Sequence, residues 1–229
     1  MKFKQLHPWH VDYEKAIQIQ KTLRDLLILK KPHGKIRTIA GADVSYDKHS
    51  DRFFAGVVVF KLNKHLELIE EVASVGKARF PYIPGLLSFR EAPILLKAFT
   101  KLKNDPDVIL FDGQGIAHPR RLGLASHMGL VLDKPSVGCA KSRLVGEYDS
   151  VKNVVGAYSK LLFKNKVVGA VLRTKANTKP VFVSAGHKAN LPFAIRIVME
   201  ACRGYRIPEP IRHAHILVNK MRRKSIYFE

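Results

Sequence analysis

The sequence of 229 residues is poor in cysteine, in acidic side chains and in long apolar runs. Its two cysteines, Cys139 and Cys202, are too few for a disulfide framework or a zinc motif, so a reducing cytoplasmic setting is expected. No apolar stretch approaches the roughly 20 residues of a membrane-spanning helix, and the N-terminus lacks the apolar core of a signal peptide. These absences argue against secreted and membrane proteins.

The shortage of acidic residues leaves a large positive charge. Lys and Arg number 40 against 19 Asp and Glu, which gives a formal net charge of +21 at pH 7. Such an excess opposes compactness through self-repulsion, and it is usually retained for a polyanionic partner. Nucleic acid is the expected partner, because the basic residues are spread along the whole chain. A local cluster, "KMRRKS" at 220–225, is interpreted either as a solvated tail or as a phosphate contact.

Apolar periodicity and turn residues predict one α/β domain over residues 1–229. Strands meander first and then alternate with helices, which is typical of a mixed sheet flanked by helices. Ser88 and Glu91 have the spacing of a capping box at the start of one helix. The predicted elements are a helix at 11–31, strands at 36–46, 53–60 and 66–80, a helix at 88–102, a strand ending at Asp112, a helix at 122–132, two strands between 154 and 173, and a C-terminal helical region broken at "RIPEP".

Two aspartates occupy strand positions where a charge is unfavourable. Asp112 directly follows the apolar run "VILF", and Asp43 lies inside the apolar stretch "IAGADVSY". If their strands are neighbours, the two carboxylates meet at one edge of the sheet, and Glu91 is a third oxygen donor nearby. Converging carboxylates favour a divalent cation such as Mg²⁺, which prefers hard oxygen ligands. Ion pairs with basic side chains are the alternative for each acid.

Five segments, in chain order, carry a resemblance to a known family. They are "GADVSYD" at 41–47, "PYIPGLLSFRE" at 81–91, "LFDGQGIAHPRRLGLASHMG" at 110–129, "PSVGCAKSRL" at 135–144 and "PEPIRHAH" at 208–215. Together they resemble endonuclease V, the deoxyinosine-directed nucleases. The resemblance implies a ribonuclease H-like fold with a mixed five-stranded sheet. It also implies Mg²⁺-dependent hydrolysis, with Mn²⁺ as a substitute, of the second phosphodiester bond 3′ to an inosine.

The resemblance assigns the catalytic residues position by position. Asp43 and Asp112 match the main metal-binding aspartates of the family, and Glu91 matches its glutamate. Lys141 matches a lysine near the scissile phosphate, where a positive charge stabilises charge on a non-bridging oxygen. His215 is a fourth candidate metal ligand, and it stands where many members have aspartate. Because imidazole lacks the negative charge of a carboxylate, the chain departs from the family's pattern at the second metal position.

The two C-terminal histidines are expected to differ in role. His213 and His215 cannot both serve one ion if their segment is helical, because residues two apart point to separate sides. His215 shares a helical face with Ile211 and Val218, which predicts that it points inward. His213 is predicted to be an ordinary surface histidine.

The segment "PYIP" at 81–84 matches the wedge loop of the family, which inserts an aromatic side chain into the duplex at the lesion. Tyr82 is that aromatic residue, and Pro81 and Pro84 restrict the loop so that insertion loses less entropy. A tyrosine that closes the core beneath the loop is the alternative.

Glycines permit the close backbone contacts that can recognise hypoxanthine, the base of inosine. Leu86 and Ile116 are predicted as apolar walls of such a pocket. His118 is expected to support the site or to contact phosphate, and a loop histidine held by backbone hydrogen bonds is the alternative. By resemblance, the further candidate substrate contacts are Ile83, Gly85, Arg90, Gly113 and Gly138.

Three other functions remain compatible with the sequence. One is a structure-selective ribonuclease H-like nuclease that cuts flaps or junctions. Another is an inosine-directed ribonuclease, because attack by water requires no 2′-hydroxyl group and leaves DNA and RNA equally open. The third is a non-catalytic nucleic-acid-binding module, against which the three intact carboxylates argue. Repair of inosine-containing DNA is the function that the resemblance favours.

Overall fold

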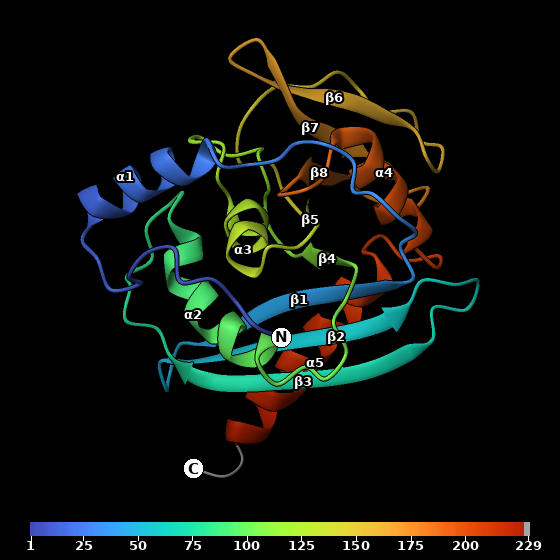
Figure 1. Cartoon of the computed structure of the whole chain (residues 1–229). Coiled ribbons are helices and arrows are strands. Elements are labelled where there is room, and N and C mark those ends of the chain that lie inside the picture. The colour runs from blue at the N-terminus through green and yellow to red at the C-terminus, as the bar shows by residue number, and fades with distance from the viewer. Residues whose placement is uncertain (227–229) are drawn as a thin grey trace.

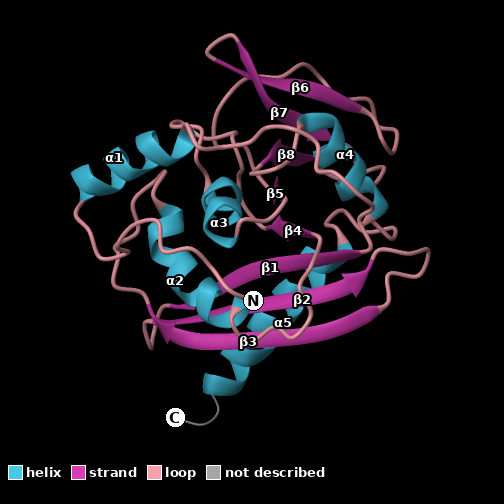
Figure 2. Cartoon of the chain, in the orientation of Figure 1, coloured by secondary structure: helices cyan, strands magenta, loops and turns pink. Residues whose placement is uncertain are grey.

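The computed structural model describes residues 1–226, which fold around one eight-stranded β-sheet with helices on both faces (Figure 1). The expected α/β class is confirmed, and Figure 2 shows the helices and strands interleaved along the chain. In chain order the elements are α1 (Tyr13–Arg24), β1 (Thr38–Asp47), β2 (Arg52–Lys61), β3 (Leu68–Lys77), α2 (Leu87–Phe99), β4 (Val108–Phe111), α3 (Leu124–Leu132), β5 (Ser136–Ala140), β6 (Tyr158–Phe163), β7 (Lys166–Leu172), β8 (Val181–Ala185), α4 (Leu191–Glu200) and α5 (Glu209–Ile226).

The sheet is mixed, as predicted, with the strand order β3-β2-β1-β4-β5-β8-β7-β6. The strands β1, β4 and β5 are parallel to one another, while β1, β2 and β3 pair antiparallel as a meander. The first five strands of this order form the expected five-stranded unit. The sheet has three strands more than the five predicted, because β8, β7 and β6 continue the same sheet through antiparallel pairings.

Each face of the sheet packs against its own pair of helices. On β1, Ile39 belongs to a core with α4 and α5, and the next residue, Ala40, belongs to a core with α2 and α3. On β4, Leu110 and Phe111 divide in the same way, as the alternation of side chains along a strand requires. In Figure 1, α2 lies in front of the sheet and α5 lies behind it. Burial on both faces explains why the central strands are almost continuously apolar.

The start of α5 lies directly against β1 at Gly41. A Cβ atom at this position would lie 2.1 Å from the Pro210 carbonyl carbon, so only glycine allows the contact. The glycine in "IAGADVSY" therefore lets α5 come close to β1. It brings the following turns of α5 alongside the strand that carries Asp43.

Three features of the predicted secondary structure are wrong. The first helix ends at Arg24 rather than at residue 31, and the Ile28 amide then donates to His187 Nδ1 at 3.3 Å. Ser88 lies inside α2 and its hydroxyl bonds to His127 Nδ1 at 2.9 Å, so it caps nothing. The short strands β5 and β8 were not anticipated. No helix within residues 1–226 is long and apolar enough to cross a membrane.

Candidate active site

The two aspartates meet at the carboxyl ends of neighbouring parallel strands. Ala42 on β1 pairs with Phe111 on β4, so the residues that follow them, Asp43 and Asp112, lie side by side. The Asp112 amide donates to the Ala42 carbonyl at 3.2 Å, which continues the ladder by one residue. Asp43 is 9% exposed. The prediction that these strands are neighbours is confirmed, and this end of the sheet is where α/β proteins commonly place their ligands.

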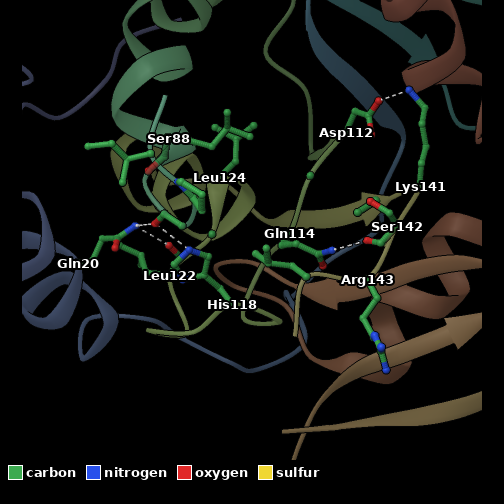
Figure 3. A pocket seen from close by; sticks show the side chains of 18 of the residues that line it. Gln20, Ser88, Asp112, Gln114, His118, Leu122, Leu124, Lys141, Ser142 and Arg143 are labelled. Carbon is green, nitrogen blue, oxygen red and sulfur yellow. Dashed lines mark hydrogen bonds and ion pairs between the residues drawn. The ribbon is translucent and has the colours of Figure 1, made fainter. Parts of the chain in front are cut away.

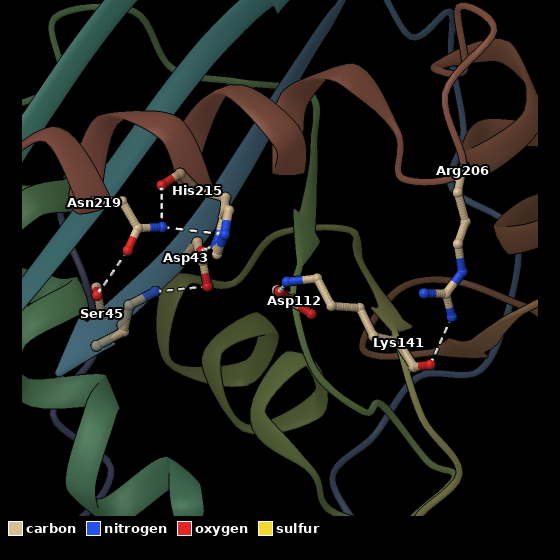
Figure 4. A network of polar contacts seen from close by, with 8 residues as sticks. Asp43, Ser45, Asp112, Lys141, Arg206, His215 and Asn219 are labelled. Carbon is tan, nitrogen blue, oxygen red and sulfur yellow. Dashed lines mark hydrogen bonds and ion pairs between the residues drawn. The ribbon is translucent and has the colours of Figure 1, made fainter. Parts of the chain in front are cut away.

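His215 reaches the same place from α5 (Figure 4). Its Nδ1 atom lies 2.7 Å from Asp43 Oδ2, and the Asn219 amide donates to its Nε2 atom at 3.1 Å. Because Nε2 accepts from Asn219, Nδ1 carries the proton and donates to Asp43. The Ser45 hydroxyl in turn donates to Asn219 Oδ1 at 3.3 Å. Asn219 was not anticipated; its position one turn after His215 is the signal that could have found it.

Asp43, Asp112 and His215 each offer one ligand atom, and these atoms all lie within 4.8 Å of one another. We call this group the acidic cluster. His215 is at its outer edge, because its side chain is 51% exposed while its predicted face-mates Ile211 and Val218 are fully buried. The expectation that His215 points inward is therefore only half correct. It lies on the border between the core and solvent, where a substrate can reach it.

Glu91, on α2, lies near the acidic cluster but is not one of the three residues whose ligand atoms converge, so its place among the metal ligands stays a prediction. Burial raises the pKa of Glu91 to about 8, and the negative charges of Asp43 and Asp112 add to the shift. Burial and Asp43 also raise the pKa of Asp112, although the Lys141 ammonium opposes this. Glu91 thus holds its proton more tightly than an exposed carboxyl group does, chiefly because it is buried and in part because two aspartates lie near it. A bound cation would favour the ionised form of Glu91.

Lys141, just after β5, forms an ion pair with Asp112. Its backbone carbonyl accepts a hydrogen bond from Arg206 Nη2 at 2.7 Å, which fixes the residue that carries the ammonium (Figure 4). Lys141 and Asp112 also line an adjoining pocket of about 370 Å³. The Lys141 ammonium, which is predicted to lie near the scissile phosphate, is therefore located between the acidic cluster and this pocket.

The pocket is lined by residues of the wedge loop and of the turn after Asp112. Figure 3 shows Gln20 and His118 on one side of it and Asp112 and Lys141 on the other. Four of the predicted substrate contacts in or next to the loop line it, as do two from the segment 113–118. These are Tyr82, Ile83, Pro84, Gly85, Gly113 and His118. Tyr82 is 68% exposed, so the alternative of a tyrosine closing the core does not describe its position.

Three side chains hold the end of the wedge loop through one carbonyl. The Gly85 carbonyl accepts from Gln20 Nε2 at 3.0 Å, from His118 Nε2 at 2.9 Å and from Arg120 Nη2 at 2.8 Å. Gln20 on α1 also accepts from Arg120 Nε, so the anchoring groups brace one another. Gln20 and Arg120 were not anticipated, since nothing in the local pattern distinguishes them from other polar residues.

His118 is neutral in this arrangement. Burial, reinforced by the Arg120 charge, lowers its pKa to about 4. Its Nδ1 atom accepts from the Arg120 amide at 3.2 Å, so Nε2 carries the proton that is donated to Gly85. The alternative for His118, a loop histidine held by backbone hydrogen bonds, describes its position, because one ring nitrogen bonds to Gly85 and the other to Arg120.

The remaining predicted contacts lie outside the pocket lining. Leu86 is fully buried in the core between α1 and α2, and Ile116 packs toward α4, with its amide donating to Ala185 at 2.8 Å. Their assignment as pocket walls is wrong, because both side chains point into the hydrophobic core and not into the pocket. A Cβ at Gly138 would lie 2.4 Å from the Gly115 nitrogen, so this glycine admits the turn after Asp112 and does not line the pocket.

Pro81 and Arg90 border the wedge loop on its outer side. Pro81 is exposed at the start of the loop. The Arg90 guanidinium lies 5.1 Å from the centre of the Tyr46 ring and 5.0 Å from that of Phe53, and it is 6.0 Å from the Tyr82 ring. Its stacking on aromatic rings holds it near Tyr82, within the region predicted to contact substrate.

Gln114, whose role the sequence left open, connects two parts of the pocket wall. Its amide donates to the Ser142 carbonyl at 3.0 Å, which ties the turn after Asp112 to the segment after Lys141 (Figure 3). Its Oε1 atom is buried and has no hydrogen-bond partner among the described residues. Other lining residues that were not anticipated are Leu87, Ser88, Leu122, Gly123, Leu124, Ala140, Arg143 and Leu144.

Solved structures of known proteins match this fold closely. The endonuclease V of Bacillus subtilis superimposes with a TM-score of 0.95 at 31% sequence identity, with 100% of both chains covered. The Ciona intestinalis enzyme, solved in complex with a 24-mer DNA containing an inosine followed by a ribo-adenosine, gives 0.82 at 30% identity, covering 92% of this chain and 98% of that one. The mixed sheet flanked by helices is thus the fold of solved endonuclease V structures, and the expected ribonuclease H-like fold is consistent with it.

Sequence comparison identifies the family. A sequence model described as Endonuclease V matches residues 21–216. The endonuclease V of Dehalococcoides mccartyi is 49% identical over 216 residues, covering 94% of this chain and 96% of the relative. That of Dictyoglomus thermophilum is 47% identical over 208 residues, covering 91% and 90%. The chain belongs to the endonuclease V family, and it is accordingly an endonuclease and a hydrolase.

Proposed function

We propose that this enzyme recognises inosine in nucleic acid and hydrolyses the second phosphodiester bond on its 3′ side, leaving a 3′-hydroxyl and a 5′-phosphate. One observation carries the proposal: Asp112 and Lys141 border both the acidic cluster and the pocket. When a base is held in the pocket, the strand that carries it therefore passes next to the carboxylates. The inosine-containing DNA bound by the Ciona intestinalis relative supports the choice of base.

The pocket suits a single flipped base. Its volume of about 370 Å³ lies within the range of roughly 300 to 1,000 Å³ that small-molecule sites occupy. Gly85 and Gly113 are part of its lining and have no side chains, so a base can come close to the backbone at these positions. Tyr82 would fill the space that the base leaves in the stack, which offsets part of the free energy of unstacking.

The donor set of the acidic cluster fits a hard divalent cation. Asp43 and Asp112 supply carboxylate oxygens, which Mg²⁺ and Mn²⁺ prefer, and His215 adds an imidazole better suited to Mn²⁺ than to Mg²⁺. Burial, together with the nearby charges of Asp43 and Asp112, raises the pKa of Glu91, and a cation held there would oppose this shift. We expect Mg²⁺ as the ion, with Mn²⁺ as a substitute. When bound, it orients the scissile phosphate and neutralises charge on the leaving 3′ oxygen.

The side chains of the protein carry out the other parts of the reaction. Asp43 and Asp112 would hold the cation. Lys141 exchanges its ion pair with Asp112 for a non-bridging phosphate oxygen, where charge accumulates in the transition state. With a cation held there, Glu91 would be ionised and would accept the proton of the attacking water, and the Asn219 amide keeps the His215 ring oriented beside Asp43.

The test is cleavage of matched single-inosine DNA and RNA oligonucleotides with Mg²⁺, alongside flap and junction substrates without inosine. The expected result is one cut, two bonds 3′ to inosine, with a product end that a polymerase extends. Comparable rates on DNA and RNA would assign the enzyme to both polymers, and a strong preference would assign it to one. Cutting of flaps or junctions irrespective of inosine would overturn the proposal.

A further inference from the structure

The outward face of α5 carries a row of cations beside the acidic cluster. Lys220, Arg223 and Lys224 are exposed, and with His215, Ile216 and Asn219 they line a hollow of about 490 Å³. Their spacing of three, four and one residues places them along one side of the helix. Arg222 points elsewhere, because its Nη1 atom donates to the Tyr46 carbonyl at 3.3 Å. The basic cluster seen in the sequence is thus divided into a row facing solvent and a residue facing the sheet.

No acid neutralises this row within the part of the chain that the structure describes. None of Lys220, Arg223 and Lys224 forms an ion pair there, whereas Glu209, the only acid of α5, is paired with Arg212 at the far end of the helix. Three neighbouring cations without counterions repel one another. A helix face of this kind complements a polyanion, whose phosphates replace the missing acids.

The row and the pocket lie on opposite sides of the acidic cluster. His215 belongs to the cluster and to the α5 hollow, whereas Asp112 belongs to the cluster and to the pocket. Figure 4 shows Asn219 to the left of Asp43, His215 beside Asp43, and Asp112 with Lys141 to the right. A strand that enters through the pocket and crosses the carboxylates therefore arrives next at α5.

We propose that Lys220, Arg223 and Lys224 bind the phosphates of the cleaved strand on the 3′ side of the scissile bond. The direction rests on the proposed function: the base occupies the pocket, the second bond 3′ to it lies at the cluster, and the strand continues away from the pocket. From His215 to Lys224 the helix rises about 13 Å, which equals about four nucleotides at 3.4 Å each. After cleavage, the fragment with the new 5′-phosphate is the one retained on α5.

The experiment compares fluorescent single-inosine DNA strands that share one 5′ flank and extend either 2 or about 10 nucleotides beyond the scissile bond. Binding is measured with Ca²⁺ in place of Mg²⁺ at several salt concentrations. The test variant is Lys220→Ala/Arg223→Ala/Lys224→Ala, which keeps good helix formers on α5. The matched control, Lys160→Ala/Lys164→Ala/Lys166→Ala, removes the same charge from exposed positions on and between β6 and β7.

Wild-type protein and the control are expected to bind the long-flank strand more tightly than the short-flank strand. The α5 variant should lose that difference, and the slope of log affinity against log salt for the long strand should fall by about 2 to 3, as expected for three phosphate contacts. Equal losses for both flank lengths, or equal losses in the control variant, would overturn the proposal. Circular dichroism of each variant identifies a loss that comes from unfolding.

The same samples separate this inference from the proposed function. Wild-type cleavage of the inosine strand with Mg²⁺ tests the function, and absence of cleavage there would overturn the function without reference to α5. Whether or not cleavage occurs, the slope of log affinity against log salt shows whether α5 binds phosphates. A retained flank-length difference in a fully active α5 variant would overturn only the assignment of α5.

Discussion

On the pocket side of the acidic cluster the polar groups are buried and joined to one another, whereas on the α5 side the cations are exposed and unpaired with any described acid. Gly85 receives three hydrogen bonds, and the neutral His118 has both ring nitrogens occupied. Lys220 and Lys224 face solvent. A site that must distinguish one base from another needs fixed backbone positions, because a displacement of an ångström removes a hydrogen bond. A surface that holds phosphates of any sequence needs only charge.

The acidic cluster between these two regions can be disabled while both are left intact. Asp112→Asn keeps the shape of the side chain but removes its charge, so cleavage with Mg²⁺ should fall by at least about 100-fold, the order of effect of one missing electrostatic partner of the transition state. Binding of an inosine strand in Ca²⁺ should be unchanged or tighter, because a negative charge near phosphates has been removed. Single-turnover cleavage and fluorescence anisotropy measure the two quantities.

Asp149→Asn, which removes an exposed charge from the segment before β6, is the matched control and should cleave at the wild-type rate. Substantial cleavage by Asp112→Asn would contradict the assignment of Asp112 as a ligand.

The wedge loop should control selectivity and leave general affinity alone. Tyr82→Ala should reduce the preference for an inosine strand over an undamaged one by roughly 5- to 150-fold, since a base–aromatic contact contributes about 1 to 3 kcal/mol. Tyr82→Phe keeps the ring and should keep the preference. Competitive cleavage of the two strands in one reaction measures the ratio directly. An unchanged ratio in Tyr82→Ala would place recognition elsewhere.

The anchor of that loop can be weakened from α1. Gln20 is 1% exposed, and Gln20→Ala removes one donor from Gly85 and leaves Arg120 Nε without its acceptor. The free energy of unfolding should fall by about 1 to 3 kcal/mol, and the inosine preference should fall by less than in Tyr82→Ala. Denaturant unfolding measures the first effect and competitive cleavage the second. Gln18→Ala, at an exposed position of the same helix, should change neither.

The neutral state of His118 predicts a small dependence of stability on pH. Its pKa is about 4 in the folded protein, below the ordinary histidine value of 6.5, so its contribution to stability is fully present above pH 6.5 and is lost as the pH falls toward 4. Between pH 8 and pH 6 the loss amounts to about 0.8 kcal/mol. Because other buried histidines also titrate, the measured quantity is the difference in unfolding free energy between wild type and His118→Gln at the two pH values. A difference that does not change with pH would contradict the neutral, buried His118.

The local pattern of the sequence determined the first four strands and the place of the two aspartates. Long apolar runs interrupted by a charge are readable without any tertiary information, because a carboxylate in such a run needs a partner. The strands β5 and β8 were missed because their runs, "SVGCA" and "VFVSA", include small residues and no charge, whereas the even shorter β4 consists of four large apolar residues followed by Asp112. Buried short runs of this kind show no alternation, and only their place in the sheet makes them strands.

Within the site, the sequence determined the types of residue, and the fold decided their roles. Glycine and proline in the wedge loop are local signals, whereas Gln20 and Asn219 acquire meaning only because α1 and α5 bring them to Gly85 and His215. Leu86 and Ile116 are apolar, as pocket walls often are, yet in the fold their side chains point into the core. The +21 charge predicted a polyanionic partner. Only the packing of α5 across β1, which Gly41 permits, decided which of the cations lie beside the carboxylates, because that contact joins residues far apart in the chain.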